Sequence, residues 1–345
     1  MHHRSKSRVI LGIVLAVLLI AGFGGGLYFF EHMHDGEGRA YDDEDVSKFL
    51  VIGDKKYEIT HNIESYLLIG TDDSGNVDKE GTDEYRGQLA DFLLLFVMDK
   101  TDNTYGMLQI DRNTMTTVMD IDREGKEIAE IDEQICTAHW YGGNPQMGCE
   151  NTVDAASRLL GGFDIDGYYS IHMSDVGTLN HAVGGVEVTL DQDFSASDPQ
   201  MTAGKTLTLS DAQAEIYVRG RMKVGDGTNA ARMQRQLNYM QKFQAKAKSK
   251  GLMGEDSTFL NELYEDLQDT AVTNIPENRL SVIANEMYKG EDQGILVLDG
   301  KTKIGETLND GIEHEEFYAT TDSIAETMMT LCGIDASHIQ EDTGE

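Results

Sequence analysis

The chain is poor in cysteine and in proline, and each shortage excludes a class of architecture. Its 345 residues include three cysteines, at positions 136, 149 and 332, and their spacing does not form the paired pattern of a metal site. Three prolines are equally few, and no proline- or serine-rich segment divides the body of the chain. We therefore expect one elaborated domain of about 280 residues rather than two domains joined by a linker.

Positive charge is also scarce. The sequence has 28 lysines and arginines against 61 acidic residues, which gives a formal net charge of -33. Such an excess of negative charge resists non-specific binding to nucleic acids and to anionic membrane surfaces, so we expect no nucleic acid partner. A dispersed acidic surface is typical of a soluble domain and does not by itself indicate a basic substrate.

The three cysteines leave the redox state open. In an oxidising exterior, Cys136 and Cys149 could close a disulfide loop, which would stabilise the fold by about 3 kcal/mol through lost chain entropy. Cys332 would then remain a free thiol. In a reducing habitat all three would be thiols, and the sequence fits either state.

One long apolar run is present, at the N-terminus. Val9 to Phe30 is a stretch of 22 residues without a charge, and as a helix it would span about 33 Å, enough to cross a bilayer. Basic residues precede it and acidic residues follow it, which predicts a cytoplasmic N-terminus and an extracytoplasmic C-terminal domain. A cleaved signal peptide is less favoured, because the run is too long and has no clear small-residue cleavage site.

We divide the chain accordingly. Residues 1–8 are expected to be a cytoplasmic tail, 9–30 a transmembrane helix, 31–63 a juxtamembrane linker with a hairpin, 64–335 an extracytoplasmic catalytic domain and 336–345 an acidic tail. Within 31–63, short strands over 49–52 and 57–59 flank a turn opened by Gly53 and Asp54.

The body of the chain alternates two hydrophobic periods. Strands are predicted over 66–69, 92–98, 105–110, 168–173 and 186–190, and helices over 152–160, 176–183, 211–218 and 230–248. Asn151 and Ser210 are suitable N-caps for two of these helices. The pattern predicts an α/β fold with a mixed central β-sheet flanked by helices.

A dense basic cluster interrupts this acidic chain. Arg219, Arg221, Lys223, Arg232 and Arg235 lie within seventeen residues, at the end of one predicted helix and the start of the next. A guanidinium group is the side chain best matched to phosphate or carboxylate oxygens. We therefore expect the cluster to bind an anionic group.

Six short motifs, in this order, resemble those of the LytR-CpsA-Psr family of cell-envelope proteins. They are Leu67-Leu68-Ile69-Gly70-Thr71-Asp72, Asp91 before an apolar strand, Arg112-Asn113-Thr114, Gly184-Gly185-Val186, Tyr217-Val218-Arg219-Gly220-Arg221 and Arg232-Met233-Gln234-Arg235-Gln236. One such motif alone would be weak, but six in order behind a membrane anchor are specific. The resemblance covers roughly residues 64–250, and more loosely the chain to about 335.

The resemblance implies a function and a set of site residues. It implies a phosphotransferase that moves a glycan polymer from a polyprenyl-pyrophosphate carrier to a hydroxyl of peptidoglycan, with magnesium on the pyrophosphate. The residues that match pyrophosphate-binding positions are Arg112, Arg219, Arg221, Arg232 and Gln236. Asp72 and Asp91 match the metal-facing positions, and Asp91 and Arg112 the catalytic ones. If the strands that carry the two aspartates are antiparallel neighbours, both carboxylates reach one edge of the sheet.

Two positions depart from the family pattern. Leu89 stands where members commonly have arginine, and Asn113 stands where they commonly have aspartate. The general base is therefore unassigned. Two other functions stay open, a non-catalytic membrane-anchored protein that binds an envelope polymer and a hydrolase of the polyprenyl-pyrophosphate glycan. The other notable groups have structural interpretations: Arg235 can face solvent, and His139, His172 and His181 lack the spacing of metal ligands.

Overall fold

We describe the protein from a computed structural model. The structure describes residues 49–72, 77–78, 85–221, 224–250, 266–267, 269–276, 279, 283, 286, 289–308, 312–334 and 339–341. Among these residues no helix combines the length and apolar character needed to cross a bilayer. The predicted transmembrane helix over 9–30 lies outside the described residues.

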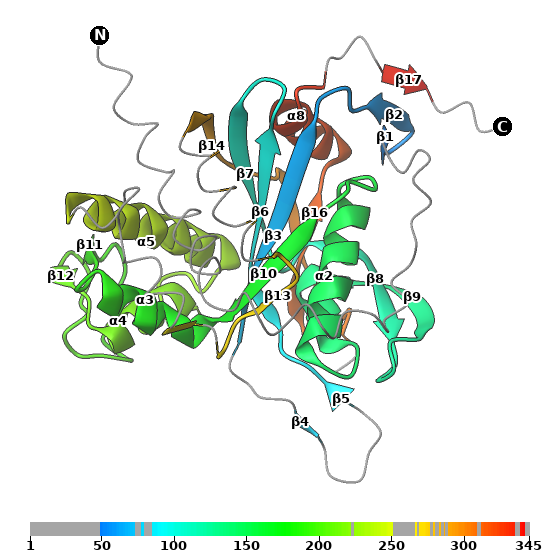
Figure 1. Cartoon of the computed structure of the whole chain (residues 1–345). Coiled ribbons are helices and arrows are strands. Elements are labelled where there is room, and N and C mark those ends of the chain that lie inside the picture. The colour runs from blue at the N-terminus through cyan, green and yellow to red at the C-terminus, as the bar shows by residue number, and fades with distance from the viewer. Residues whose placement is uncertain are drawn as a thin grey trace, which may run out of the picture.

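A six-stranded mixed sheet forms the centre of the molecule (Figure 1). In spatial order its strands are β13 (Val272–Thr273), β10 (Gly167–His172), β3 (Ile63–Thr71), β6 (Ala90–Asp99), β7 (Thr104–Ile110) and β14 (Glu291–Val297). β10 runs parallel to β3 and β14 runs parallel to β7, whereas the other neighbouring pairs are antiparallel. The predicted mixed α/β architecture is confirmed.

The sheet is covered on both faces, which explains why its central strands are apolar along most of their length. On one face lie α3 (Val176–Ala182), α4 (Asp211–Arg219) and α5 (Asn229–Ser249), and on the other lie α2 (Pro145–Leu159) and α8 (Thr321–Cys332) (Figure 1). Each face of the sheet has its own hydrophobic core, and alternate residues of β6 pack into the two cores. Leu94 and Phe96 pack toward the first face, and Leu93 and Leu95 toward the second.

Helix ends follow capping chemistry, with one correction. Ser210 caps α4 as predicted, and its hydroxyl accepts a hydrogen bond from N–H of Gln213 at 3.3 Å. The prediction that Asn151 caps the helix over 152–160 is wrong. α2 begins earlier, at Pro145, and Asn144 is its cap. The buried Asn151 side chain instead donates to the carbonyl oxygens of Met119 and Ala138. A proline at the first helical position is favoured because its missing N–H would have no helical partner there.

A turn of two left-handed glycines ends α3. Gly184 and Gly185 have φ of 71° and 86°, and their N–H groups donate to carbonyl groups of His181 and Asn180. A Cβ at Gly185 would lie 2.6 Å from the Thr208 side chain. The chain therefore needs glycine here to leave the helix and pair β11 (Glu187–Thr189) with β12 (Thr206–Thr208).

The predicted hairpin belongs to the packed body. It consists of β1 (Phe49–Ile52) and β2 (Lys55–Glu58), and Leu50, Ile52 and Tyr57 are buried in the core beside α8. β17 (Ile339–Glu341), within the predicted acidic tail, adds a third strand to it.

Several short elements have no clear sequence signal. They are β4 (Val77–Asp78), β5 (Tyr85–Arg86), the hairpin of β8 (Met115–Ile121) and β9 (Glu127–Gln134), the 3-10 helices η1 (Ile135–Trp140) and η2 (Met173–Asp175), and the hairpin of β15 (Gly300–Gly305) and β16 (His314–Ala319). Of these, η1 and β16 border the candidate site.

Candidate functional site

The two candidate aspartates lie at one edge of the central sheet. β3 ends and β6 begins at this edge because the two strands are antiparallel neighbours. This is the arrangement that brings both carboxylates to one edge. The backbone of Asp72 pairs with Leu89, whose N–H also donates to Oδ1 of Asp72 at 3.1 Å. The pairing shifts register between Gly70 and Thr71, so Asp91 has no partner residue on β3. Such a bulge redirects a side chain, here toward the end of β7.

Two arginines converge on Asp91. Nη1 of Arg112, which follows β7, donates a hydrogen bond to Oδ1 of Asp91. Nη1 of Arg232, on the first turn of α5, lies 3.6 Å from the same oxygen. Asp91 and Arg112 side chains are 13 % exposed and Arg232 is 6 % exposed. The structure thus joins residues from β6, β7 and α5 in one largely buried ionic cluster.

Arg232 is held by a second set of polar groups. Nη2 of Arg232 donates to Oδ1 of Asn229, and Nδ2 of Asn229 donates to Oδ1 of Asp111 at 2.5 Å. Burial and the charges of Arg112 and Arg221 together lower the pKa of Arg232 to about 10, against the opposing effect of Asp91. Arg232 therefore stays charged at neutral pH. It sits close to like charges, which makes the cluster receptive to an anion.

Arg112 also contacts a buried thiol. Nη2 of Arg112 donates to Sγ of Cys136 at 3.0 Å. Burial alone would lower the pKa of Arg112, but the hydrogen bond to Cys136 and the charge of Asp91 raise it above its ordinary value. Burial raises the pKa of Cys136, so the thiol stays neutral. All three cysteines are free, and the possible Cys136–Cys149 disulfide is not formed: Sγ of Cys149 faces Nε2 of His139 at 3.5 Å.

Arg221 and Arg219 have separate carboxylate partners. Nη2 of Arg221 donates to Oε2 of Glu315 on β16, and both side chains are 22 % exposed. The charge of Arg221 also lowers the pKa of Arg232, so Arg221 belongs to the same cluster. Nη1 of Arg219 donates to Oε1 of Glu215 at 2.7 Å, one turn earlier on the same helix. This pair ties Arg219 to its own helix rather than to Asp91.

The arginine cluster, Arg112, Arg221 and Arg232, has unused donors. The Nε atom of each is buried and lacks a hydrogen-bond partner within the described part of the chain. A buried donor without an acceptor costs free energy, more so on a charged group. Three such donors in one cluster fit an anion with several oxygens, such as a diphosphate.

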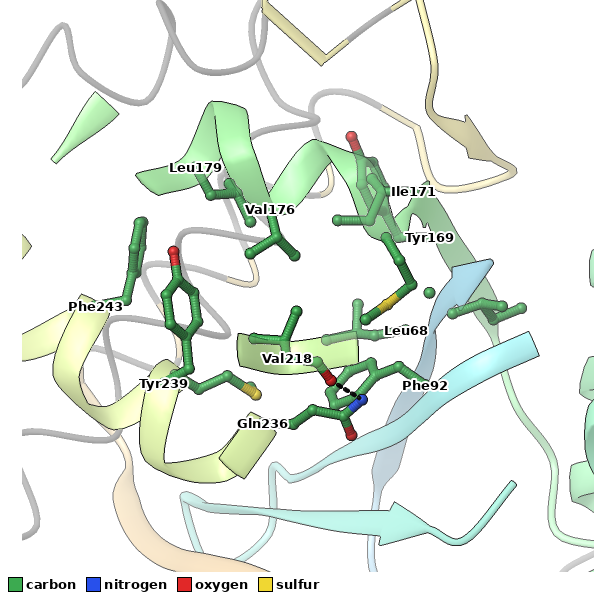
Figure 2. Close-up of a pocket in the computed structure, with 14 residues that line it drawn as sticks. Leu68, Phe92, Tyr169, Ile171, Val176, Leu179, Val218, Gln236, Tyr239 and Phe243 are labelled. Atoms are coloured by element: carbon green, nitrogen blue, oxygen red, sulfur yellow. Dashed lines mark hydrogen bonds between the residues drawn. The ribbon is translucent and has the colours of Figure 1, made fainter. Parts of the chain in front are cut away.

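An apolar pocket is lined by residues that neighbour those of the cluster along the chain (Figure 2). Its volume is about 90 Å³, and it lies between the sheet and helices α3, α4 and α5. Its walls include Phe92 beside Asp91, Val218 beside Arg219, and Gln236 one turn after Arg232. Nε2 of Gln236 donates to the carbonyl oxygen of Val218 at 3.4 Å, so this amide joins α5 to α4 at the pocket wall. The remaining walls are made of apolar side chains, several of them aromatic, from the sheet, η2, α3 and α5.

Arg235 is not the solvent-facing residue that its helical position suggested. It is 1 % exposed, and its guanidinium donates to the carbonyl oxygens of Tyr217 (3.2 Å) and Gly220 and to Oε1 of Gln192 (2.7 Å). The guanidinium carbon also lies 5.4 Å from the ring centroid of Phe194. Arg235 therefore holds the end of α4, which includes Arg219, and the residues that follow it, which include Arg221.

The aspartate pair fits a hard divalent cation. Both arginine contacts of Asp91 use Oδ1, and the charge of Asp72 reaches Arg112 and contributes to its raised pKa. Two carboxylates from neighbouring strand ends offer oxygen ligands of the kind Mg²⁺ prefers, with the remaining positions left to waters and phosphate oxygens. The residues present are therefore compatible with the predicted magnesium site.

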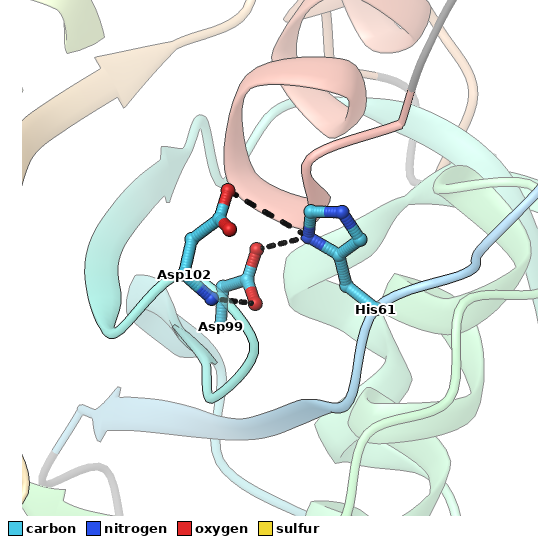
Figure 3. A group of neighbouring side chains, drawn as sticks. All are labelled: His61, Asp99 and Asp102. Atoms are coloured by element: carbon cyan, nitrogen blue, oxygen red, sulfur yellow. Dashed lines mark hydrogen bonds and ion pairs between the residues drawn. The ribbon is translucent and has the colours of Figure 1, made fainter.

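A second group of potential ligands lies at the far end of β6 (Figure 3). Nδ1 of His61 is 2.6 Å from Oδ2 of Asp99 and 4.0 Å from Oδ2 of Asp102. Oδ1 of Asp99 accepts the N–H groups of Thr101 and Asp102. An ion pair on a tight turn accounts for this group, so the geometry gives no reason to add a metal.

The sequence model of the LytR_cpsA_psr family matches residues 34–330. The chain belongs to this family. A protein of Halalkalibacterium halodurans named polyisoprenyl-teichoic acid–peptidoglycan teichoic acid transferase TagU is 25 % identical over 222 residues, covering 64 % of this chain and 66 % of the relative. An Enterococcus faecalis protein of the same name is 26 % identical over 234 residues, covering 64 % of each. The matched regions thus span just under two thirds of these relatives.

Solved structures show the same fold at low sequence identity. Protein gbs0355 from Streptococcus agalactiae has a TM-score of 0.59 at 18 % identity, covering 81 % of this chain and 91 % of that one. TagV of B. subtilis has a TM-score of 0.56 at 19 % identity, covering 79 % and 96 %. TagT bound to LIIa-WTA has a TM-score of 0.53 at 17 % identity, covering 82 % and 96 %.

Proposed function

We propose that this protein is a magnesium-dependent phosphotransferase that moves a glycan polymer from a polyprenyl-pyrophosphate carrier to a hydroxyl group of peptidoglycan. The observation that carries the proposal is the meeting of the arginine cluster with Asp91 beside an apolar pocket. A lipid-linked diphosphate needs those two environments side by side. Family membership and the names of the two TagU relatives support the same reaction.

In the proposed complex, Arg112, Arg221 and Arg232 bind the diphosphate oxygens through donors that include their unpaired Nε atoms. Arg219 and Gln236 approach from the end of α4 and from the pocket wall. Preorganised guanidinium groups in a site with little water stabilise the charge that grows on the phosphate oxygens as the bond to the leaving phosphate breaks. Arg112 and Asp91 are the groups closest to this chemistry.

Asp72 and Asp91 would hold the magnesium ion, which would neutralise charge on the diphosphate. The acceptor oxygen forms a new bond to the phosphorus next to the glycan, the bond to the other phosphate breaks, and polyprenyl phosphate leaves. The acceptor hydroxyl loses its proton to a base that we do not assign.

The polyprenyl tail would enter the apolar pocket. The present volume of about 90 Å³ is smaller than the cavity of about 150 Å³ that holds benzene in another protein. The pocket as it stands therefore admits only the start of the tail, and α3 and α5 would have to separate to admit more. In the same proposal the segment over 9–30 anchors the protein in the membrane, with the catalytic domain outside.

One assay separates this proposal from its two alternatives. Full-length protein in detergent is incubated with a polyprenyl-pyrophosphate-linked glycan, magnesium and peptidoglycan fragments, with teichoic acid as the first polymer to test because of the relatives' names. Glycan joined to peptidoglycan supports transfer. Released phosphorylated glycan without joining supports the hydrolase, and unchanged substrate bound to the protein supports a binding role.

A further inference from the structure

A carboxylate from the C-terminal part of the chain forms an ion pair with Arg221. Glu315 lies 94 positions after Arg221, yet its Oε2 accepts a hydrogen bond from Nη2 of that residue. The backbone of β16 is fixed at this place: Nε2 of Gln134 donates to the carbonyl oxygen of Glu315 at 2.6 Å, and N–H of Phe317 donates to the carbonyl oxygen of Asn113 at 2.8 Å. The pair is therefore set by the fold and is not a chance contact of two long surface side chains.

The side chain of Asn113 is complementary to this carboxylate. Asn113 is 3 % exposed, and its Nδ2 donates to the same Oε2 of Glu315 at 3.4 Å. An aspartate at position 113 would lack that donor and would place a second negative charge against Glu315. Asn113 and Glu315 form a matched pair.

The carboxylates of Asp91 and Glu315, which both pair with arginines of the cluster, differ in their exposure to solvent. Asp91 is 13 % exposed and lies between two arginines, whereas Glu315 and Arg221 are each 22 % exposed and form a one-to-one pair. A carboxylate and a phosphate accept the same guanidinium donors. An incoming phosphate can therefore take the place of the Glu315 carboxylate, which has solvent to move into.

We infer that Glu315 is a resident anion that occupies Arg221 until a phosphate group displaces it, and that this competition sets the affinity of the site. The inference rests on the proposed function in one respect, because it takes the displacing anion to be the diphosphate of the carrier. It also goes beyond that function, since it assigns a role to Glu315 on β16: this carboxylate lowers the affinity of the arginine cluster for other anions.

Binding of inorganic pyrophosphate to the full-length protein in detergent, measured by calorimetry, tests the inference. Glu315→Gln keeps an acceptor for Asn113 but removes the charge, and it should tighten pyrophosphate binding by roughly twofold to fivefold, the range expected for losing a partly exposed competing ion pair. Glu315→Asp, which withdraws the carboxylate by one methylene, should tighten it less. In an Arg221→Ala background, Glu315→Gln should have no effect. Glu130→Gln, which removes the partner of Arg158 on the β8–β9 hairpin, is the matched control and should change nothing.

Unchanged or weaker binding in a folded Glu315→Gln protein overturns the inference. So does equal tightening in the Arg221→Ala background, because that would reflect overall charge rather than competition for Arg221. If the wild-type protein transfers glycan while Glu315→Gln fails to tighten pyrophosphate binding, only this inference fails. A wild-type protein that neither binds pyrophosphate nor transfers glycan overturns the proposed function as well.

Discussion

Arg112 donates a hydrogen bond to Asp91, 21 positions earlier in the chain, across the edge of the central sheet. The contact follows from topology. β6 and β7 are antiparallel, and their register places Leu93 opposite Ile110, so the first residues of β6, which include Asp91, and the residues just after β7 extend over the same edge. The pair gives the proposed catalytic residues a fixed geometry before any substrate binds.

Replacing arginines of the site should weaken binding of a polyprenyl pyrophosphate. Arg221→Ala and Arg219→Ala each remove charge-assisted hydrogen bonds worth about 1.5 to 3 kcal/mol, or roughly tenfold to 150-fold in affinity. We expect the larger loss from Arg221, because it belongs to the arginine cluster and has a buried, unpaired Nε atom, whereas Arg219 is tied to Glu215 on its own helix. Arg158→Ala, at an exposed ion pair on the other side of the sheet, is the control. Wild-type affinity in both site variants would contradict the assignment.

Asp91→Asn should have opposite effects on binding and on transfer. Without its charge, Arg112 and Arg232 lose a competing anion, so pyrophosphate should bind more tightly in the absence of magnesium. Glycan transfer should fall sharply because a metal ligand is lost, and added magnesium should recover part of the rate. A variant that transfers glycan at the wild-type rate at limiting magnesium would show that Asp91 is not a ligand.

Filling the pocket should separate lipid binding from diphosphate binding. Val218 is buried in the pocket wall, so Val218→Phe should reduce affinity for a polyprenyl pyrophosphate while leaving that for inorganic pyrophosphate unchanged. Calorimetry with the two ligands measures both effects. Equal losses for both ligands would indicate a disturbed arginine cluster, and no loss for the lipid would place the tail elsewhere.

Arg235→Ala should reduce stability. It leaves the carbonyl oxygens of Tyr217 and Gly220 and the Gln192 side chain without their buried donor. Hydrogen bonds from a charged group contribute about 1.5 to 3 kcal/mol each, so a loss of at least about 3 kcal/mol is expected. Urea unfolding of the variant measures it. A loss below about 1 kcal/mol would show that the α4–α5 segment does not depend on Arg235.

The His61–Asp99 pair should make stability depend on pH. The hydrogen bond to Asp99 raises the pKa of His61 above 6.5 against the opposing effect of burial, and the charges of Asp99 and Asp102 add to the rise. A raised pKa means that the stabilisation is complete below about pH 6.5, the ordinary pKa, and declines as pH rises through the folded-state value. The difference in melting temperature between wild type and His61→Gln should therefore shrink from pH 5.5 to pH 9. The nearby Cys332 thiol, whose pKa is raised by burial, stays neutral across this range. A difference that is constant or grows with pH would contradict the assignment.

Local patterns in the sequence were sufficient to predict four of the six strands of the central sheet, β3, β6, β7 and β10, and part of the candidate site. The apolar runs that became β3, β6 and β7 are bounded by turn residues, and antiparallel pairing of β3 with β6 then brings Asp72 and Asp91 to one edge. Ser210 could be recognised as a cap from its position alone. These predictions succeeded because each depends on residues close together in the chain or on one strand pairing.

Contacts between distant segments could not be predicted in this way. Glu315 has no motif or spacing that links it to Arg221, and η1, which brings Cys136 to Arg112, lacks a helical period. The start of α2 was missed because Asn144 and Pro145 precede the first apolar repeat of that helix. Arg235 was expected in solvent because helical spacing predicts only which side of α5 the residue lies on. It does not predict that the chain around Gly220, distant in sequence, packs against that side.

The most direct test of the account is a crystal structure of the protein with a polyprenyl pyrophosphate and magnesium. The account predicts diphosphate oxygens within hydrogen-bonding distance of the Nε atoms of Arg112, Arg221 and Arg232, with the lipid tail entering between Phe92 and Val218. A diphosphate bound away from all three arginines, or a tail lying outside the pocket, would contradict it.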